Sequence, residues 1–212
     1  MIHSFIACLY SFRYSASQAS SGHTSLSNHL PSLQFLAEDG ISIPCNYTSY
    51  VAPISSQKLW RSVKAMGQRK AMETTYVVKL HNFSQLATEK KCFYFEHPVP
   101  NSSVTDNRRY SVLSFAIEQD SLVHGFAGYF ESVLYGDVAI SIVPYSFSEG
   151  MFSWFPLYIP LRHPVLVKAG QTLTSHFWRC CSSDKVWYEW SVTSPIPSPI
   201  HNCGGRSQII GL

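Results

Sequence analysis

The sequence predicts a mainly β protein, built as an antiparallel barrel or sandwich. Two observations carry this prediction. Eight segments between residues 75 and 192 are rich in Val, Phe, Tyr and Trp, and several alternate apolar with polar residues. Turn residues separate these segments at short intervals, without helical periodicity between them, which favours antiparallel over parallel pairing. The chain has 212 residues, of which 45% are hydrophobic, and this is enough for one sizeable domain.

The strands are expected at residues 75–80, 92–97, 108–118, 123–135, 137–143, 164–170, 172–180 and 186–192. Four aromatic residues near the end of the chain, Trp178, Trp187, Tyr188 and Trp190, are interpreted as packing residues, because aromatic pairs across strands stabilise sheets. Trp187 and Trp190 differ by an odd number of positions and are therefore expected on opposite faces.

Two proline-containing stretches are harder to assign. Residues 41–55 read as extended chain interrupted by Pro44 and Pro53. In GMFSWFPLYIPLRHP, residues 150–164, Pro156 and Pro160 argue against an ordinary central strand. The aromatic pair in this stretch either fills a core or lines a place that a ligand enters.

Helical spacing is confined to two segments. Residues 32–40 suggest a short helix that ends at Gly40, and the first 35 residues are otherwise expected to be an irregular leader. In residues 55–74, Leu59, Val63 and Met66 form one apolar stripe, while Trp60 broadens it. A helix this short needs a partner surface, either its own domain or a second subunit.

Composition and motifs indicate what the chain lacks. A formal charge of +3 with scattered cations disfavours nucleic-acid binding, and no run of about 18 apolar residues is available to span a membrane. The six cysteines show no metal-binding spacing and are expected as free thiols. No GxG turn, P-loop, GxSxG or HExxH motif occurs, so we expect neither a cofactor nor a metal in this chain, and an isolated His is interpreted as a satisfied structural residue. We expect a soluble protein of the cytoplasm and nucleus.

Several motifs in order carry a family resemblance. The stretches HGFAGYFESVLY, GMFSWFPLYIPL, FWRC and KVWYEWSVTSP, with the ending IHN…GRS…IGL, strongly resemble the C-terminal barrel of the protein arginine methyltransferase 5 family, which makes symmetric dimethylarginine. The upstream stretches EDGISIP…YTSYVAPISSQKLW and YVVKLHNFSQL resemble the entry into that barrel and its dimerisation arm, at about residues 52–75. The resemblance covers residues 36–212 as one barrel domain.

The resemblance implies that this chain lacks the parts that perform methyl transfer. Full-length members carry a TIM-like barrel that binds a WD-repeat partner, and a Rossmann-type domain that holds S-adenosylmethionine. Both would precede residue 36, so neither the WD-repeat partner nor the cofactor is expected here. The family's two catalytic glutamates lie on a hairpin loop shortly before the barrel. The corresponding place in this chain is residues 1–35, which contain no acidic residue. The chain is therefore expected to be inactive alone.

The resemblance also assigns roles to two groups of residues. Trp154 would stack on the substrate guanidinium, with Phe155 narrowing the arginine channel and Phe152 and Ser153 shaping the turn. Leu59, Trp60, Val63 and Met66 would belong to the dimer arm, giving a homodimer or a heterodimer with a full-length relative. Arginine-containing proteins, including histones and RNA-binding proteins, would be the substrates of the full-length enzyme. The alternatives are an independent β-rich binding module, for a sugar or an arginine peptide, and a dominant regulator of a full-length relative.

Overall fold

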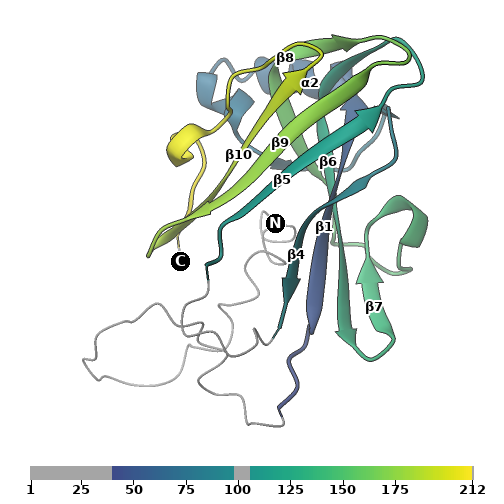
Figure 1. Cartoon of the computed structure of the whole chain (residues 1–212), viewed down its shortest axis with the longest axis vertical. Coiled ribbons are helices and arrows are strands. Elements are labelled where there is room, and N and C mark those ends of the chain that lie inside the picture. The colour runs from purple at the N-terminus through teal and green to yellow at the C-terminus, as the bar shows by residue number, and fades with distance from the viewer. Residues whose placement is uncertain (1–39, 98–105, 212) are drawn as a thin grey trace.

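Two antiparallel sheets stack face to face, as the computed structural model shows for residues 40–97 and 106–211 (Figure 1). The larger sheet has the order β2-β8-β6-β1-β3, with β4 also paired to β1 and β7 also paired to β6. The smaller sheet has the order β11-β10-β9-β5. The mainly β, antiparallel fold predicted from the sequence is confirmed. The predicted leader at residues 1–35 and the short helix at 32–40 lie outside the described residues.

The strands have the following bounds: β1 Asn46–Ser55, β2 Tyr76–Val77, β3 Ser84–Gln85, β4 Lys90–Glu96, β5 Arg109–Ala116, β6 Ser121–Tyr135, β7 Val138–Ser141, β8 Leu157–Val167, β9 Thr172–Cys181, β10 Lys185–Ser194 and β11 Ile210–Gly211. One α-helix, α2 (Gln57–Lys64), and three 3-10 helices, η2 (Arg69–Glu73), η3 (Pro144–Ser146) and η4 (Cys203–Gly205), complete the described elements. No helix among residues 40–97 and 106–211 is long and apolar enough to cross a bilayer.

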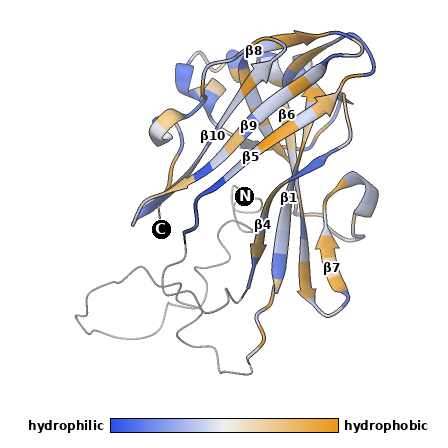
Figure 2. Ribbon diagram, in the orientation of Figure 1, coloured by the Kyte–Doolittle hydropathy of each residue, from blue (hydrophilic) through white to orange (hydrophobic). Residues whose placement is uncertain are grey.

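The core lies between the sheets because each strand alternates its side chains. In β9 the odd positions, such as Leu173 and Phe177, are buried, and the even positions are more exposed. The same alternation is visible as changing hydropathy along the smaller sheet (Figure 2). Trp190 of β10 is almost fully buried, and its indole N–H donates to the Pro160 carbonyl at 2.8 Å. This hydrogen bond joins the two sheets through their core.

Of the four prolines expected to interrupt strands, Pro44 and Pro156 lie just before strands, whereas Pro53 and Pro160 lie within them. β8 runs through Pro160 and Pro164, and β1 runs through Pro53. Pro160 needs no hydrogen-bond partner on the far side of β8, because β2 pairs only with Tyr158 and Leu157. The register between β6 and β8 also shifts between Val123 and Gly125, next to the Gly125–Pro160 pair. Edge position and a bulge therefore accommodate the prolines of β8.

The predicted helix at 55–74 is two shorter helices. α2 ends at Lys64, and Gly67 follows with φ +70°, a left-handed conformation that ends helices at little cost to glycine. The chain resumes as the 3-10 helix η2. The predicted strand at 75–80 is likewise reduced to Tyr76–Val77. The local sequence pattern thus predicted the places of this helix and this strand, but it overestimated their lengths.

Candidate functional site

The arm segment, here residues 56–75, packs against its own domain. Ser56 caps α2 by accepting a hydrogen bond from the Leu59 N–H at 3.5 Å. Val63 is buried in the core, and Leu59 and Trp60 are half-buried against it. The indole N–H of Trp60 donates to the Leu161 carbonyl of β8 at 2.8 Å. One side of α2 thus packs on its own domain, which was the first of the two partner surfaces that the sequence left open.

The other side of the arm segment faces away from the core. Met66 is 54% exposed, and Lys58, Arg61 and Lys64 are exposed as the helical spacing predicts. The Lys64 ammonium lies 4.6 Å from the centre of the Trp60 ring, in a cation–π contact. The surface that a second subunit would meet is therefore Met66 with a row of cations. Whether one binds there stays a prediction.

A buried ion cluster fixes the root of the arm segment. Glu73, at the end of η2, is 1% exposed and accepts two hydrogen bonds from the Arg206 guanidinium, at 2.6 and 2.7 Å. It also pairs with Arg162 of β8 and accepts from the Ser207 hydroxyl at 3.1 Å. A bidentate guanidinium–carboxylate pair is among the stronger hydrogen-bonded contacts in proteins. Residues near the C-terminus thus hold the arm segment against the barrel.

The C-terminal segment adds neutral hydrogen bonds to this anchor. Gln208 accepts from the N–H and hydroxyl of Thr75 at 2.8 and 2.9 Å. Asn202, with φ +51°, donates to the Tyr188 and Gln208 carbonyls and accepts from two backbone N–H groups. These contacts give a physical reason for the IHN…GRS motif. The sequence offered no signal for the buried Glu73 cluster, because a lone carboxylate in a helical segment usually faces water.

His201 is a satisfied structural residue, as expected for an isolated histidine. Its Nε2 accepts from the Arg162 backbone N–H at 2.9 Å, which leaves Nδ1 as the donor to the Trp190 carbonyl at 3.1 Å. The ring stacks on Trp190 with centroids 5.3 Å apart. Burial lowers the pKa of His201 to about 4, so the ring is neutral at pH 7.

The aromatic loop, residues 150–156, holds the predicted pocket-wall residues. It turns at Gly150, which has φ +81°, and the Phe152 N–H donates to the Gly150 carbonyl at 2.8 Å. Trp154 is half-buried and meets Phe130 of β6 edge to face, with centroids 5.3 Å apart. Phe155 lies 5.1 Å from the Lys79 ammonium. Phe152 is 86% exposed and Ser153 is also exposed.

The arm segment and the aromatic loop are separate sites. Trp60 lies near His124 of β6, and Trp154 meets Phe130 of the same strand. These two positions are six residues apart, or about 20 Å along an extended strand. The predicted arm residues therefore lie together, and so do the predicted channel-wall residues, but the two groups lie apart.

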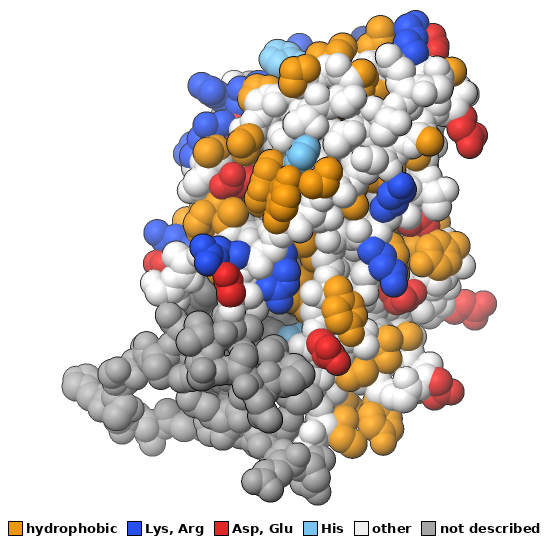
Figure 3. All heavy atoms as spheres, viewed as in Figure 1, with side chains coloured by type: hydrophobic (Ala, Val, Ile, Leu, Met, Phe, Trp, Pro, Cys, Tyr) orange, Lys and Arg blue, Asp and Glu red, His pale blue; other side chains and the backbone are white. Residues whose placement is uncertain are grey.

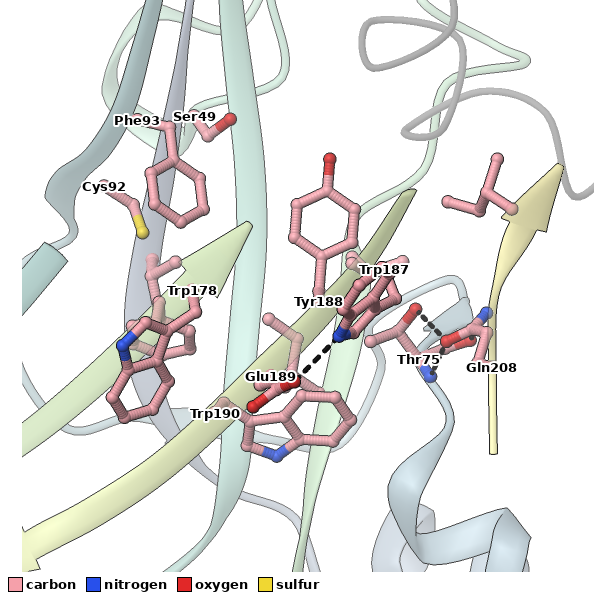
Figure 4. A pocket seen from close by; sticks show the side chains of 15 residues that line it. Ser49, Thr75, Cys92, Phe93, Trp178, Trp187, Tyr188, Glu189, Trp190 and Gln208 are labelled. Carbon is pink, nitrogen blue, oxygen red and sulfur yellow. Dashed lines mark hydrogen bonds between the residues drawn. The ribbon is translucent and has the colours of Figure 1, made fainter. Parts of the chain in front are cut away.

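A cavity of about 50 Å³ lies beside β10 (Figure 4). Its lining includes Cys92, Phe93, Tyr188 and Gln208, and none of the predicted pocket-wall residues. This volume is enough for a few water molecules. Among the described residues there is also no glycine pair in GxG spacing and no His, Cys, Asp or Glu cluster that could hold a metal ion.

The comparison with known proteins is consistent across sequence and structure. Residues 46–210 match the family model of the PRMT5 oligomerisation domain. The chain is 50% identical over 182 residues to protein arginine N-methyltransferase 5 of Oryza sativa, covering 84% of this chain and 28% of that protein. The match to the Xenopus laevis protein of the same name is 51% identical over 183 residues, covering 84% and 29%. The chain thus spans less than a third of these relatives.

A solved structure supports the fold alone. The Trypanosoma brucei PRMT1 enzyme–prozyme heterotetrameric complex with AdoHcy superposes with a TM-score of 0.59 at 14% identity, over 78% of this chain and 58% of that chain. The family model and the sequence relatives carry the assignment. The chain belongs to the PRMT5 family of protein arginine methyltransferases and contains the oligomerisation domain of that family.

Proposed function

We propose that this chain serves as the barrel and self-association part of a protein arginine methyltransferase that forms symmetric dimethylarginine, and that it does not transfer methyl groups alone. The observation that carries this proposal is the match of residues 46–210 to the family model of the oligomerisation domain. The substrates of the assembled enzyme would be arginine-containing proteins of the cytoplasm and nucleus.

Self-association through the arm segment is tested by sedimentation velocity over a range of concentrations. Met66 is exposed and its sulfur lies 3.8 Å from the Tyr76 hydroxyl, so replacing it with Glu would disturb a partner without changing a buried side chain. We expect the wild-type chain to form dimers and Met66→Glu to shift it toward monomer at least tenfold in dissociation constant. Arg61→Gln, on the same exposed surface, reports how much the cations contribute. A strictly monomeric wild-type chain would contradict the arm assignment.

The cofactor part of the proposal is tested by calorimetry. Titrating S-adenosylmethionine into the 212-residue chain should give no binding isotherm. Co-purification of a tagged copy with a full-length relative then distinguishes a structural part from a regulator of that relative. A micromolar isotherm from the isolated chain would refute the proposal that it lacks the methyl-transfer machinery.

The aromatic loop is proposed as the wall of the arginine channel in the assembled enzyme. Trp154 would stack on the planar guanidinium, Phe155 would narrow the channel, and Phe152 and Ser153 would shape the turn. The exposure of Phe152 and the edge-on support of Trp154 by Phe130 are consistent with a loop that another domain meets. Grafting residues 46–210 into the Xenopus relative allows the test. Trp154→Leu should lower kcat/KM at least tenfold, whereas Tyr145→Leu, outside the loop, should leave it unchanged.

A further inference from the structure

Three aromatic rings stack on the outward face of the smaller sheet, opposite the core. Tyr110 of β5 lies 5.2 Å from Trp178 and 5.9 Å from His176, both of β9, and those two rings lie 5.8 Å apart. The planes differ by only 16° to 21°. Tyr110 is 55% exposed, and Figure 3 shows hydrophobic side chains gathered beside a histidine over β5 and β9. We call these three residues the aromatic face.

Hydrogen bonds hold the aromatic face in one arrangement. The Tyr110 hydroxyl lies 2.7 Å from His176 Nδ1, and His176 Nε2 lies 2.9 Å from the Thr193 hydroxyl of β10. Exposed rings fixed in this way lose little side-chain entropy on binding, which is typical of binding hot spots. Tyr110 and Trp178 are also direct cross-strand partners, so their stacking stabilises the sheet as well as fixing the rings.

A carboxylate lies beside the aromatic face. Glu189 of β10 is the direct cross-strand neighbour of Trp178. Since β9 lies between β5 and β10, Tyr110 covers the indole from the β5 side, and Glu189 lies on the other side. Glu189 Oε1 accepts from the Trp187 indole N–H at 2.7 Å and from the Gly204 N–H at 2.8 Å, which orients the carboxylate. Within the described residues, Glu189 forms no ion pair with a Lys, Arg or His side chain.

The nearby arginines do not neutralise this carboxylate. Arg108, next to Tyr110 in sequence, pairs with Asp106 at 2.8 Å. Arg179, next to Trp178, points to the core side, where its guanidinium lies 5.5 Å from the Phe95 ring. The exposed face therefore combines electron-rich rings with one unneutralised negative charge. This combination is complementary to a planar cation.

We propose that the aromatic face and Glu189 form a docking site for arginine side chains of arginine-rich protein segments, apart from the channel proposed at Trp154. A guanidinium would stack on Trp178 and pair with Glu189. Lysine would bind less well, because its compact ammonium neither stacks as a plane nor forms a fork of hydrogen bonds. The site rests on the proposed function in one respect only: it would retain the arginine-rich flanks of substrates while one arginine enters the channel.

Fluorescence anisotropy with the 212-residue chain tests the site directly. The probes are a labelled peptide of alternating Gly and Arg and the same peptide with Lys in place of Arg, which keeps the charge. We expect the arginine peptide to bind at least fivefold more tightly. Glu189→Gln and Trp178→Leu should each weaken its binding at least fivefold. Glu118→Gln, an equal change of charge at an exposed position outside the site, should not.

Each outcome decides the proposal. Equal affinity for the two peptides, or equal losses in Glu189→Gln and Glu118→Gln, would reduce the binding to general charge attraction and overturn it. If Trp178→Leu changes sedimentation of the chain without changing peptide affinity, the face is a contact between copies, and the proposal is again wrong. Thermal unfolding of every variant separates these results from misfolding. None of these measurements involves methyl transfer or the arm segment, so the proposed function can fail while this site is confirmed, and the reverse.

Discussion

Glu73 is the residue that holds the arm segment in place on the barrel. Its carboxylate is almost fully buried and compensates the charge of Arg162 and Arg206. Removing one partner of a buried ion pair is costly, because the remaining charge stays away from water. We expect Glu73→Gln to lower the free energy of unfolding by about 3–5 kcal/mol in urea titrations. Arg206→Gln should cost less, because Arg162 still pairs with Glu73 and the Arg206 side chain is 45% exposed. The reverse order would contradict this account of the cluster.

His201 makes stability depend on pH. Its pKa is lowered from 6.5 to about 4 in the folded state, so the unfolded chain binds the proton more readily between these values. The stabilisation is fully present above pH 6.5 and is lost as pH falls toward about 4, by an amount on the order of 3 kcal/mol. Burial also lowers the pKa of His97 and His124, which act in the same direction. Unfolding free energies of His201→Asn should therefore show a shallower slope over this range than wild type.

The backbones of strands β6 and β8 approach each other closely at Gly125. A Cβ at Gly125 would lie 2.3 Å from the Ile159 carbonyl oxygen and 2.8 Å from the Tyr158 ring. A backbone atom cannot move aside cheaply, so Gly125→Ala should destabilise by about 1–3 kcal/mol or more. Gly211→Ala is the control, because a Cβ there meets nothing within 4 Å. Similar melting temperatures for both variants would mean that the bulge next to Gly125 relaxes.

Elements with strong local patterns could be predicted from sequence, and those set by distant contacts could not. The segment 123–135 was recognised as a strand because it is rich in aromatic residues, and β6 contains it. The start of β8 was missed because Pro160 is unfavourable in most strands and tolerable only where pairing ends. The clusters at Glu73 and at Tyr110 join residues far apart in sequence, so no local pattern announces them.

For the whole molecule, exposed rings set the expected behaviour in solution. Of the three aromatic residues of the aromatic loop, Trp154 and Phe155 are half-buried and Phe152 is largely exposed. Phe152→Ser should therefore raise the concentration at which the chain remains soluble, with little change in unfolding free energy. Trp154→Ser should instead lower stability by about 1–3 kcal/mol, because it loses its contact with Phe130. Light scattering and urea titration separate the two effects.

The anchor between Glu73 and Arg206 joins positions 133 residues apart. A stop codon placed just before Arg206 would delete no residue of α2, yet it would free the segment that carries this helix. Such a shortened product should lose its ability to pair with another copy long before its two sheets come apart. Tags and fusions for studies of assembly are better attached at the opposite terminus.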